Sequence, residues 1–396
     1  MTTAKVIGLR GDDAVAYAVK QCNVDCIAAY PITPQTIIVE TLSKFVSNGE
    51  MNAKYINVES EHSAMSATIG ACLAGGRVFT ATASQGLALM HEVLYAASGL
   101  RCPIVLAVAN RALSAPINIH CDHSDVMGSR DSGWVILFAE NCQEAYDLTI
   151  LAFKLAEDED ILLPVMVNLD GFILSHSLER VEVIPDEEVK RWLPPRQAKY
   201  KVDPKNPITF GVFSLFDSYF EIKRGQEDAM RMVLKKIPEI YDKFYELSGR
   251  QYSNLVKYKM DDAEHVIVVL GSTAGTARHA ADRLREEGIK AGVLSLHLFR
   301  PFPTKEVQKS LSNTKTVTVM DRAISFGAQG GPLFEDIATA LYDTPNRPLI
   351  ASYIYGLGGR DITSRQIREA VRKSIQAQEE GKKIIRMGFI GVKGGE

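Results

Sequence analysis

Short apolar runs alternate with helix-like segments through the first half of the chain. Between the runs, apolar positions recur with helical spacing at about 35–47, 61–75, 85–99 and 142–158. The runs themselves are CIAAY, KYINV, RVFTATAS, PIVLAVAN and ILLPVMVNLD. Apolar strands separated by helices are typical of a parallel sheet with both faces covered. The pattern therefore predicts an α/β domain. Residues 110–134 have no clean period, and a loop of that length inside a domain is usually functional.

A change of composition separates this region from a second one. Residues 189–209 are rich in Pro, Lys and Arg and predict an extended connector, and 222–248 read as a charged amphipathic helix. From about 262 the strand–helix alternation restarts. We predict a first domain at 1–255, with a connector at 189–250, and a smaller α/β domain at 256–396.

Composition and charge narrow the class of protein. The 396 residues are 46% hydrophobic and 23% charged, which is ordinary for a globular protein. A formal net charge of −3 gives no electrostatic footprint for nucleic acid. No apolar run reaches the roughly 18 residues of a membrane span, and the N-terminus lacks a signal-peptide pattern. We therefore expect a cytoplasmic protein that binds neither nucleic acid nor membrane. The scattered cysteines indicate small core or surface residues rather than a disulfide framework or a metal site; they are Cys22, Cys26, Cys72, Cys102, Cys121 and Cys142.

Three polar residues follow predicted strands, where open α/β sheets bind ligands. In AAYPITPQT, Thr33 precedes Pro34, and the pattern predicts Thr33 as the N-cap and Pro34 as the first residue of a helix. In VESEHSA, Ser60 can cap a helix whose first turn contains Glu61. That carboxylate either complements the helix dipole or handles protons in the crevice. Arg111 follows PIVLAVAN and could bind a carboxylate through two parallel hydrogen bonds, or form a structural salt bridge.

Three other motifs have weaker claims to a ligand. HCDH at 120–123 contains metal-ligand residue types without zinc-site spacing, so loop packing or an interface contact is the better interpretation. GSTAGT at 271–276 could bind a phosphate, but it matches neither GxGxxG nor GxxxxGK(S/T), the two glycine-rich nucleotide-binding motifs. A tight turn between a strand and a helix is the better interpretation. GDD at 11–13 precedes a helical run and lacks the downstream Asn of a magnesium–diphosphate motif.

The motifs AYPITPQT, VESEHSAMSATIGA, TATASQGLALMHE, NRALSAPINI and SRDSGW together resemble the alpha subunit of the 2-oxoacid:ferredoxin oxidoreductases, most closely the pyruvate enzymes. The similarity extends to YGLGGRDIT and so covers nearly the whole chain. It implies a thiamine-diphosphate pyrimidine-binding domain followed by a transketolase-C-terminal-like domain. It also implies that a beta subunit holds the diphosphate, Mg²⁺ and a [4Fe–4S] cluster, with gamma and delta subunits completing a complex that reduces ferredoxin. Coenzyme A would accept the acyl group.

The resemblance also assigns roles to residues. Glu61 matches the glutamate that bonds N1′ of the aminopyrimidine and promotes its imino tautomer. Arg111 and Thr33 match the residues that bind the 2-oxoacid, and Ser84 and Gln85 are lesser candidates for lining the cofactor. No metal ligand is assigned to this chain.

Pyruvate is the expected substrate of the reaction. A dicarboxylate such as 2-oxoglutarate would need a second cation, and residues 110–134 offer only Arg111 and the distant Arg130. A branched-chain oxoacid stays the closer alternative, because one methylene changes binding by only about 1–3 kcal/mol. A non-catalytic nucleotide-binding partner subunit is a further alternative, disfavoured by Thr33, Glu61 and Arg111 at successive crevice positions.

Overall fold

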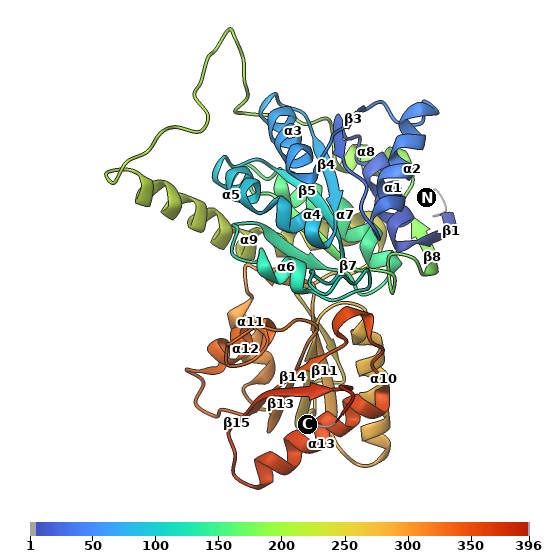
Figure 1. Ribbon diagram of the computed structural model, residues 1–396, viewed down its shortest axis with the longest axis vertical. Coiled ribbons are helices and arrows are strands. Elements are labelled where there is room, and N and C mark those ends of the chain that lie inside the picture. Colours follow the sequence, from blue (N-terminus) through green and yellow to red (C-terminus); the bar gives the residue numbers. More distant parts are fainter. Residues whose placement is uncertain (1–4, 395–396) are drawn as a thin grey trace.

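The computed structural model describes residues 5–394 and contains two stacked α/β units (Figure 1). The first unit is built from β1 (Lys5–Arg10), α1 (Gly11–Gln21), β2 (Cys26–Ala29), α2 (Thr36–Ser47), β3 (Lys54–Asn57), α3 (Glu61–Leu73), β4 (Val78–Thr82), α4 (Ser84–Leu89), α5 (His91–Gly99), β5 (Ile104–Asn110), α6 (Ser124–Gly128), β6 (Val135–Phe138), α7 (Cys142–Ala156), β7 (Val165–Asp170), β8 (Leu178–Val183), α8 (Asp186–Trp192) and α9 (Tyr219–Ser248). The second contains β9 (Leu255–Tyr258), β10 (His265–Val269), α10 (Thr273–Glu286), β11 (Ala291–Leu296), β12 (Leu298–Arg300), α11 (Thr304–Leu311), β13 (Thr316–Asp321), α12 (Pro332–Leu341), β14 (Leu349–Tyr355), the 3₁₀ turn η1 (Leu357–Gly359), α13 (Ser364–Glu379) and β15 (Ile384–Ile390).

The first sheet has the strand order β12-β6-β7-β5-β4-β2-β3. Its strands are parallel except for β12, which comes from the chain segment of the second unit and pairs antiparallel with β6. Alternate residues of β5 enter different cores: Ala107 packs with α1 and α7, whereas Leu106 and Val108 pack with α3 and α5. The strand is buried on both faces, which explains its continuous apolar run. The predicted α/β fold is therefore confirmed for this region.

The second sheet has the order β15-β14-β13-β10-β11-β9, with β9 as its antiparallel edge. One apolar cluster contains residues of both units, including Leu106, Val268 and Phe334. The two sheets therefore share part of one core. No helix within residues 5–394 combines the length and apolar character that crossing a membrane requires.

Two sequence-predicted helices differ from the structure. The predicted helix at 85–99 is two helices, α4 and α5, that meet at Met90. The amphipathic helix starts at Tyr219, three residues before its predicted start, and its first buried residue is Ala229. Its first turns and the loop before them extend away from the body of the first unit (Figure 1).

Candidate active site

The sequence-predicted site residues follow neighbouring strands of the first sheet. Arg111 follows β5, Ser84 begins α4 after β4, Thr33 lies beyond β2, and Glu61 begins α3 after β3. These strands are adjacent in the order β5-β4-β2-β3 and run parallel. Their carboxyl ends therefore meet at one edge of the sheet, where ligands of open α/β sheets bind.

Glu61 is placed by the cap of its helix. Ser60 is the N-cap, and its Oγ accepts a hydrogen bond from the Ser63 N–H at 3.2 Å, as the sequence predicts. The Glu61 side chain is buried, and within residues 5–394 no group donates a hydrogen bond to its carboxylate. A largely buried carboxylate without a protein donor leaves its oxygens open to a ligand, so the geometry fits a group that brings an N–H.

The start of α4 forms the wall beside Glu61. A Cβ atom added to Gly86 would lie 2.6 Å from Glu61 Oε1 and closer still to Thr82 Oγ1. The Thr82 hydroxyl is buried, and the described residues provide no hydrogen-bond partner for it. The close packing requires glycine at position 86 and holds the carboxylate against the first turn of α4.

Ser84 and Gln85 join the turn after β4 to the loop after β5. Ser84 Oγ donates to the backbone carbonyl of Ala112 at 2.5 Å, and Gln85 Nε2 donates to Ser114 Oγ at 2.7 Å. Ser84 is fully buried and Gln85 is partly exposed. Both have a visible structural function, and their contact with a cofactor stays a prediction.

Arg111 contacts the loop that contains Thr33. Its Nη1 donates to the Thr33 carbonyl at 3.0 Å, and its Nε donates to the Asn118 carbonyl at 2.9 Å. Burial lowers the pKa of Arg111, while nearby Asp125 opposes that shift. Neither Arg111 Nη2 nor Thr33 Oγ1 forms a hydrogen bond within the described chain. Arg111 is thus tied to the backbone of Thr33 and keeps one guanidinium nitrogen for a ligand, which suits a carboxylate.

The predicted helix cap at Thr33 is wrong. Helix α2 begins at Thr36, and Gln35 occupies the N-cap position. Gln35 Nε2 donates to the Tyr30 carbonyl at 2.8 Å, while Arg111 binds the Thr33 carbonyl. The local contact of Gln35 and the long-range contact of Arg111 together hold a turn at 33–35. The Thr-Pro sequence alone could not predict the contact with Arg111.

Sequence reasoning missed Asp125, whose carboxylate joins the segments that contain Ser84 and Arg111. The carboxylate accepts hydrogen bonds from the backbone N–H groups of Ser84 at 3.0 Å and Arg111 at 2.9 Å, and from Asn110 Nδ2 at 3.0 Å. Burial raises the pKa of Asp125, and these hydrogen bonds partly oppose the shift. Nothing in the local sequence around Asp125 signals this role, because its partners follow two other strands.

The loop at 120–123 lies between the two units. His123 Nε2 lies 2.7 Å from Asp170 Oδ1, and the Arg322 Nη1 of the second unit donates to Asp170 Oδ2 at 2.9 Å. Possible ligand atoms of Cys121, His123 and Asp170 lie within 4.8 Å of one another. The Arg322 cation already pairs with this carboxylate, which favours an interface contact over a metal site.

Asp170 also binds the first turn of α10. Its Oδ2 accepts hydrogen bonds from the Ser272 N–H at 3.2 Å and the Ser272 hydroxyl at 2.5 Å. A Cβ atom on Gly271 would lie 2.7 Å from Asp170 Oδ1. The GSTAGT turn therefore receives a protein carboxylate where a phosphate could otherwise bind. GDD, at 11–13, starts α1 as predicted but also directly follows β1, so its rejection as a diphosphate motif rests on the missing downstream Asn.

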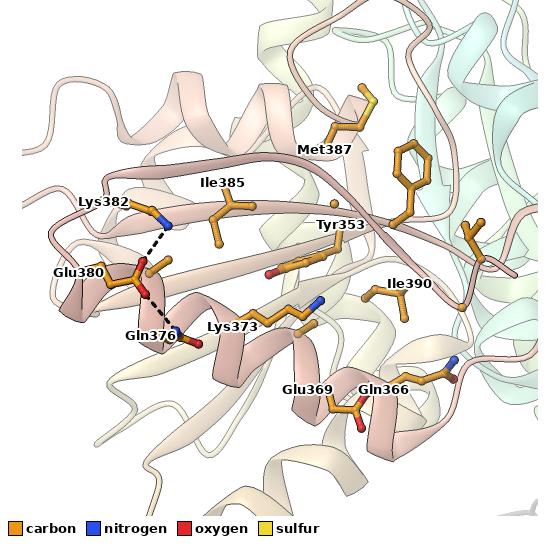
Figure 2. Close-up of a pocket in the computed structure, with 16 residues that line it drawn as sticks. Tyr353, Gln366, Glu369, Lys373, Gln376, Glu380, Lys382, Ile385, Met387 and Ile390 are labelled. Carbon is orange, nitrogen blue, oxygen red and sulfur yellow. Dashed lines mark hydrogen bonds and ion pairs between the residues drawn. The ribbon is translucent and has the colours of Figure 1, made fainter. Parts of the chain in front are cut away.

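A wide groove lies in the second unit, apart from the elements that carry these residues. It has a volume of about 950 Å³ and lies between α13 and strands β14 and β15 of the second sheet (Figure 2). Its floor includes Tyr353, Ile385 and Ile390, and Glu380 on its rim is paired with Lys382 at 2.7 Å. It contains none of the sequence-predicted site residues, so its size alone does not make it the active site.

Comparisons with known proteins cover both units. Residues 17–242 match the family described as pyruvate flavodoxin/ferredoxin oxidoreductase, thiamine diP-binding, and residues 263–367 match pyruvate:ferredoxin oxidoreductase core domain II. Pyruvate synthase subunit PorA of Thermotoga maritima is 55% identical over 93% of this chain and 94% of its own length. Ketoisovalerate oxidoreductase subunit VorA of Pyrococcus abyssi is 44% identical over 94% of each chain.

The fold also agrees with a solved structure. The 2-oxoglutarate:ferredoxin oxidoreductase of Magnetococcus marinus, with 2-oxoglutarate, coenzyme A and succinyl-CoA bound, superposes with a TM-score of 0.75 at 22% identity. That match covers 94% of this chain and 66% of the other, so this chain spans just under two thirds of its length. With family matches across both units and a relative 55% identical over nearly the full length, the chain belongs to the pyruvate:ferredoxin oxidoreductase family, as a subunit of the alpha type.

Proposed function

We propose that this chain is the alpha subunit of a pyruvate:ferredoxin oxidoreductase, or pyruvate synthase. The reaction converts pyruvate and coenzyme A to acetyl-CoA and CO₂ while ferredoxin accepts the electrons, and it can run in reverse. The observation that carries the proposal is the convergence of Thr33, Glu61 and Arg111 at the carboxyl edge of one parallel sheet. A non-catalytic subunit would not need a donor-free buried carboxylate beside a held guanidinium edge.

Glu61 would hold the aminopyrimidine of thiamine diphosphate. Bound there, thiamine diphosphate supplies the carbon nucleophile and the electron sink that decarboxylation requires. The buried Glu61 carboxylate would accept a hydrogen bond from the protonated N1′, which supplies the donor that the described part of the protein lacks there. The close contact with Gly86 fixes the carboxylate, so the proton is held at one atom rather than shared with water.

Arg111 and Thr33 would bind the pyruvate carboxylate. Arg111 keeps two of its nitrogens on backbone carbonyls, which orients the remaining edge without a competing protein carboxylate. Thr33 Oγ1 can donate one more hydrogen bond to the same ligand. The contact between Arg111 and the Thr33 carbonyl sets the two donors relative to each other before substrate binds.

The remaining cofactors would lie on partner subunits. We propose that a beta subunit binds the diphosphate with Mg²⁺ and holds a [4Fe–4S] cluster, and that gamma and delta subunits complete the path to ferredoxin. The six cysteines of this chain are free thiols, and among residues 5–394 no cluster of four forms. Subunit names of the relatives imply a multi-subunit complex.

An exposed apolar arm supports such an assembly. At the loop before α9 and the start of that helix, Phe213, Phe216 and Phe220 are 92%, 95% and 77% exposed. Val212, Leu215 and Tyr219 are also more than half exposed there. Contiguous apolar surface of this kind marks a contact with another protein.

Substrate kinetics of the purified complex test the proposal. We expect kcat/KM for pyruvate to exceed the values for 2-oxoisovalerate and 2-oxoglutarate, with 2-oxobutyrate as the nearest competitor. The VorA relative makes 2-oxoisovalerate the second candidate. A tenfold preference for either larger oxoacid would overturn pyruvate as substrate, and absence of turnover with every 2-oxoacid would overturn the reaction class.

A further inference from the structure

Two cysteine thiols, from α3 and from the segment before β5, line the same cavity. Cys72 belongs to the last turns of α3, and Cys102 lies two residues before the first residue of β5. Both are 1% exposed, and both line one cavity together with Arg196. Neighbouring thiols on separate elements can form a covalent bond when their sulfurs approach each other.

A cation lies against one sulfur of the pair. Arg196, in the segment after α8, places Nη1 3.4 Å from Cys72 Sγ and also bonds the Cys72 carbonyl. The hydrogen bond from Cys102, followed by the Arg196 charge, lowers the pKa of Cys72 despite its burial and the opposing charge of Glu157. Cys72 is thus the member of the pair that favours the thiolate.

The other cysteines of the chain differ in their surroundings. Burial is the main cause that raises the thiol pKa of Cys22, Cys26, Cys121 and Cys142. At Cys102 the main cause of the raised pKa is the hydrogen bond with Cys72, followed by burial. Reactivity of a cysteine follows its thiolate character. The chain therefore contains one activated thiol with a second thiol placed beside it.

A small cavity reaches the pair. It has a volume of about 290 Å³, and both Cys72 and Cys102 line it together with Arg196. Tyr200 and Phe210 of the connector form part of its wall. A cavity of this size admits a molecule such as hydrogen peroxide, since one water needs about 30 Å³.

We propose that Cys72 and Cys102 are a peroxide-sensitive thiol pair that closes to a disulfide. The Cys72 thiolate attacks one peroxide oxygen, the O–O bond breaks, and a sulfenic acid and hydroxide form. The Cys102 sulfur then attacks the Cys72 sulfur, the S–O bond breaks, and hydroxide leaves; with the protons of both thiols, the peroxide yields two waters. The two sulfurs are oxidised and the peroxide is reduced.

The bond would connect two elements that carry the candidate active site. Helix α3 begins with Glu61, and β5 ends directly before Arg111. This modification is separate from the proposed reaction and uses none of its residues.

Peptide mass spectrometry of the assembled complex tests the pair. The complex is treated with hydrogen peroxide, its free thiols are alkylated, and peptides of this chain are analysed with and without dithiothreitol. We expect a linked Cys72–Cys102 peptide that dithiothreitol releases, while Cys22 and Cys121 are recovered as free thiols. Recovery of both thiols as alkylated peptides, oxidation of Cys72 without linkage, or linkage to another cysteine would each overturn the proposal.

Arg196→Gln separates activation of the thiol from mere proximity. We expect linkage to slow by about tenfold, the change in thiolate fraction for one pKa unit. Arg191→Gln is the matched control, because Arg191 is exposed and pairs with Glu188 at 2.8 Å. An unchanged rate in the Arg196 variant would overturn the assignment of Cys72 as the activated thiol.

Discussion

At the residue scale, the candidate site depends on side chains whose hydrogen-bonding positions are only partly satisfied by the protein. Glu61 is buried without a donor, and Arg111 uses only part of its guanidinium on backbone carbonyls. Unpaired polar groups at a buried site cost free energy, so they persist where a ligand completes them. Each of these two residues therefore has a substitution whose effect distinguishes ligand binding from structure.

Glu61→Gln should remove most activity of the assembled complex. Gln preserves the shape of the side chain but cannot take up a proton, so we expect a loss of about 10²-fold or more in kcat. Circular dichroism and thermal unfolding should match those of the parent. Glu59→Gln, which changes an exposed carboxylate two residues away, serves as the control and should leave kcat unchanged. Near-normal turnover in the Glu61 variant would reduce this residue to a helix-dipole contact.

Arg111→Lys should mainly raise KM for pyruvate. Lysine keeps the positive charge but loses the planar fork that binds the Thr33 and Asn118 carbonyls and a ligand together. Steady-state kinetics should show a KM increase of about tenfold, corresponding to roughly 1.4 kcal/mol of binding. Arg10→Lys, at a partly buried ion pair with Asp13 outside the candidate site, provides the comparison. Equal KM values for the parent and the Arg111 variant would exclude Arg111 from the substrate site.

At the element scale, the chain shows which features a sequence can predict. The strands after which Glu61 and Arg111 lie were predictable, because runs such as PIVLAVAN are apolar and bounded by turn residues. The turn at Thr33 was not, since Arg111 holds it from 78 residues away. Asp125 was missed for the same reason: its carboxylate joins loops after different strands. Local pattern predicts elements, whereas contacts between elements decide how site residues are held.

Gly86→Ala should disrupt the site through the packing of α4 on α3. The new Cβ would lie 2.6 Å from Glu61 Oε1, so the carboxylate or the first turn of α4 must move. We expect kcat to fall by more than tenfold, since small displacements of catalytic groups are costly. Gly70→Ala is the matched control on α3, where an added Cβ meets nothing within 4 Å. That variant should keep activity and gain up to about 1 kcal/mol of stability; equal behaviour of the two variants would contradict this account.

At the scale of the whole molecule, one buried carboxylate connects the two units. Burial alone would raise the pKa of Asp170, but His123, Arg322 and Ser272 together hold it below its usual range. A carboxylate with a depressed folded-state pKa stabilises the fold above its unfolded pKa of about 4, and this contribution is lost as pH falls below that value. The contact thus couples the loop at 120–123 to the second unit most strongly at neutral pH.

Asp170→Asn should weaken the connection between the units. The change leaves the buried Arg322 without its counter-charge, at a cost of about 3–5 kcal/mol in the free energy of unfolding. Denaturant titrations should show this loss at pH 7, and a smaller difference from the parent below about pH 4. Adding Arg322→Met should recover part of the stability, because it removes the unpaired charge. A constant difference across that pH range would show that the carboxylate charge is not responsible.

The whole molecule also predicts a split active site, so the isolated chain should be unable to turn over pyruvate. GDD at 11–13 lacks the downstream Asn of a magnesium–diphosphate motif, and the described cysteines do not assemble a cluster, so neither the diphosphate–Mg²⁺ site nor an electron acceptor is evident here. The purified chain is assayed with thiamine diphosphate, Mg²⁺, coenzyme A, pyruvate and a viologen acceptor, before and after addition of separately prepared partner subunits. We expect viologen reduction only after addition, and none when the added-back chain is Glu61→Gln. The Glu61→Gln chain differs from the parent by one side chain, so an inactive complex with this variant would show that assembly alone does not restore the reaction. Viologen reduction by the pure chain would instead place the complete chemistry on this subunit and refute the shared site.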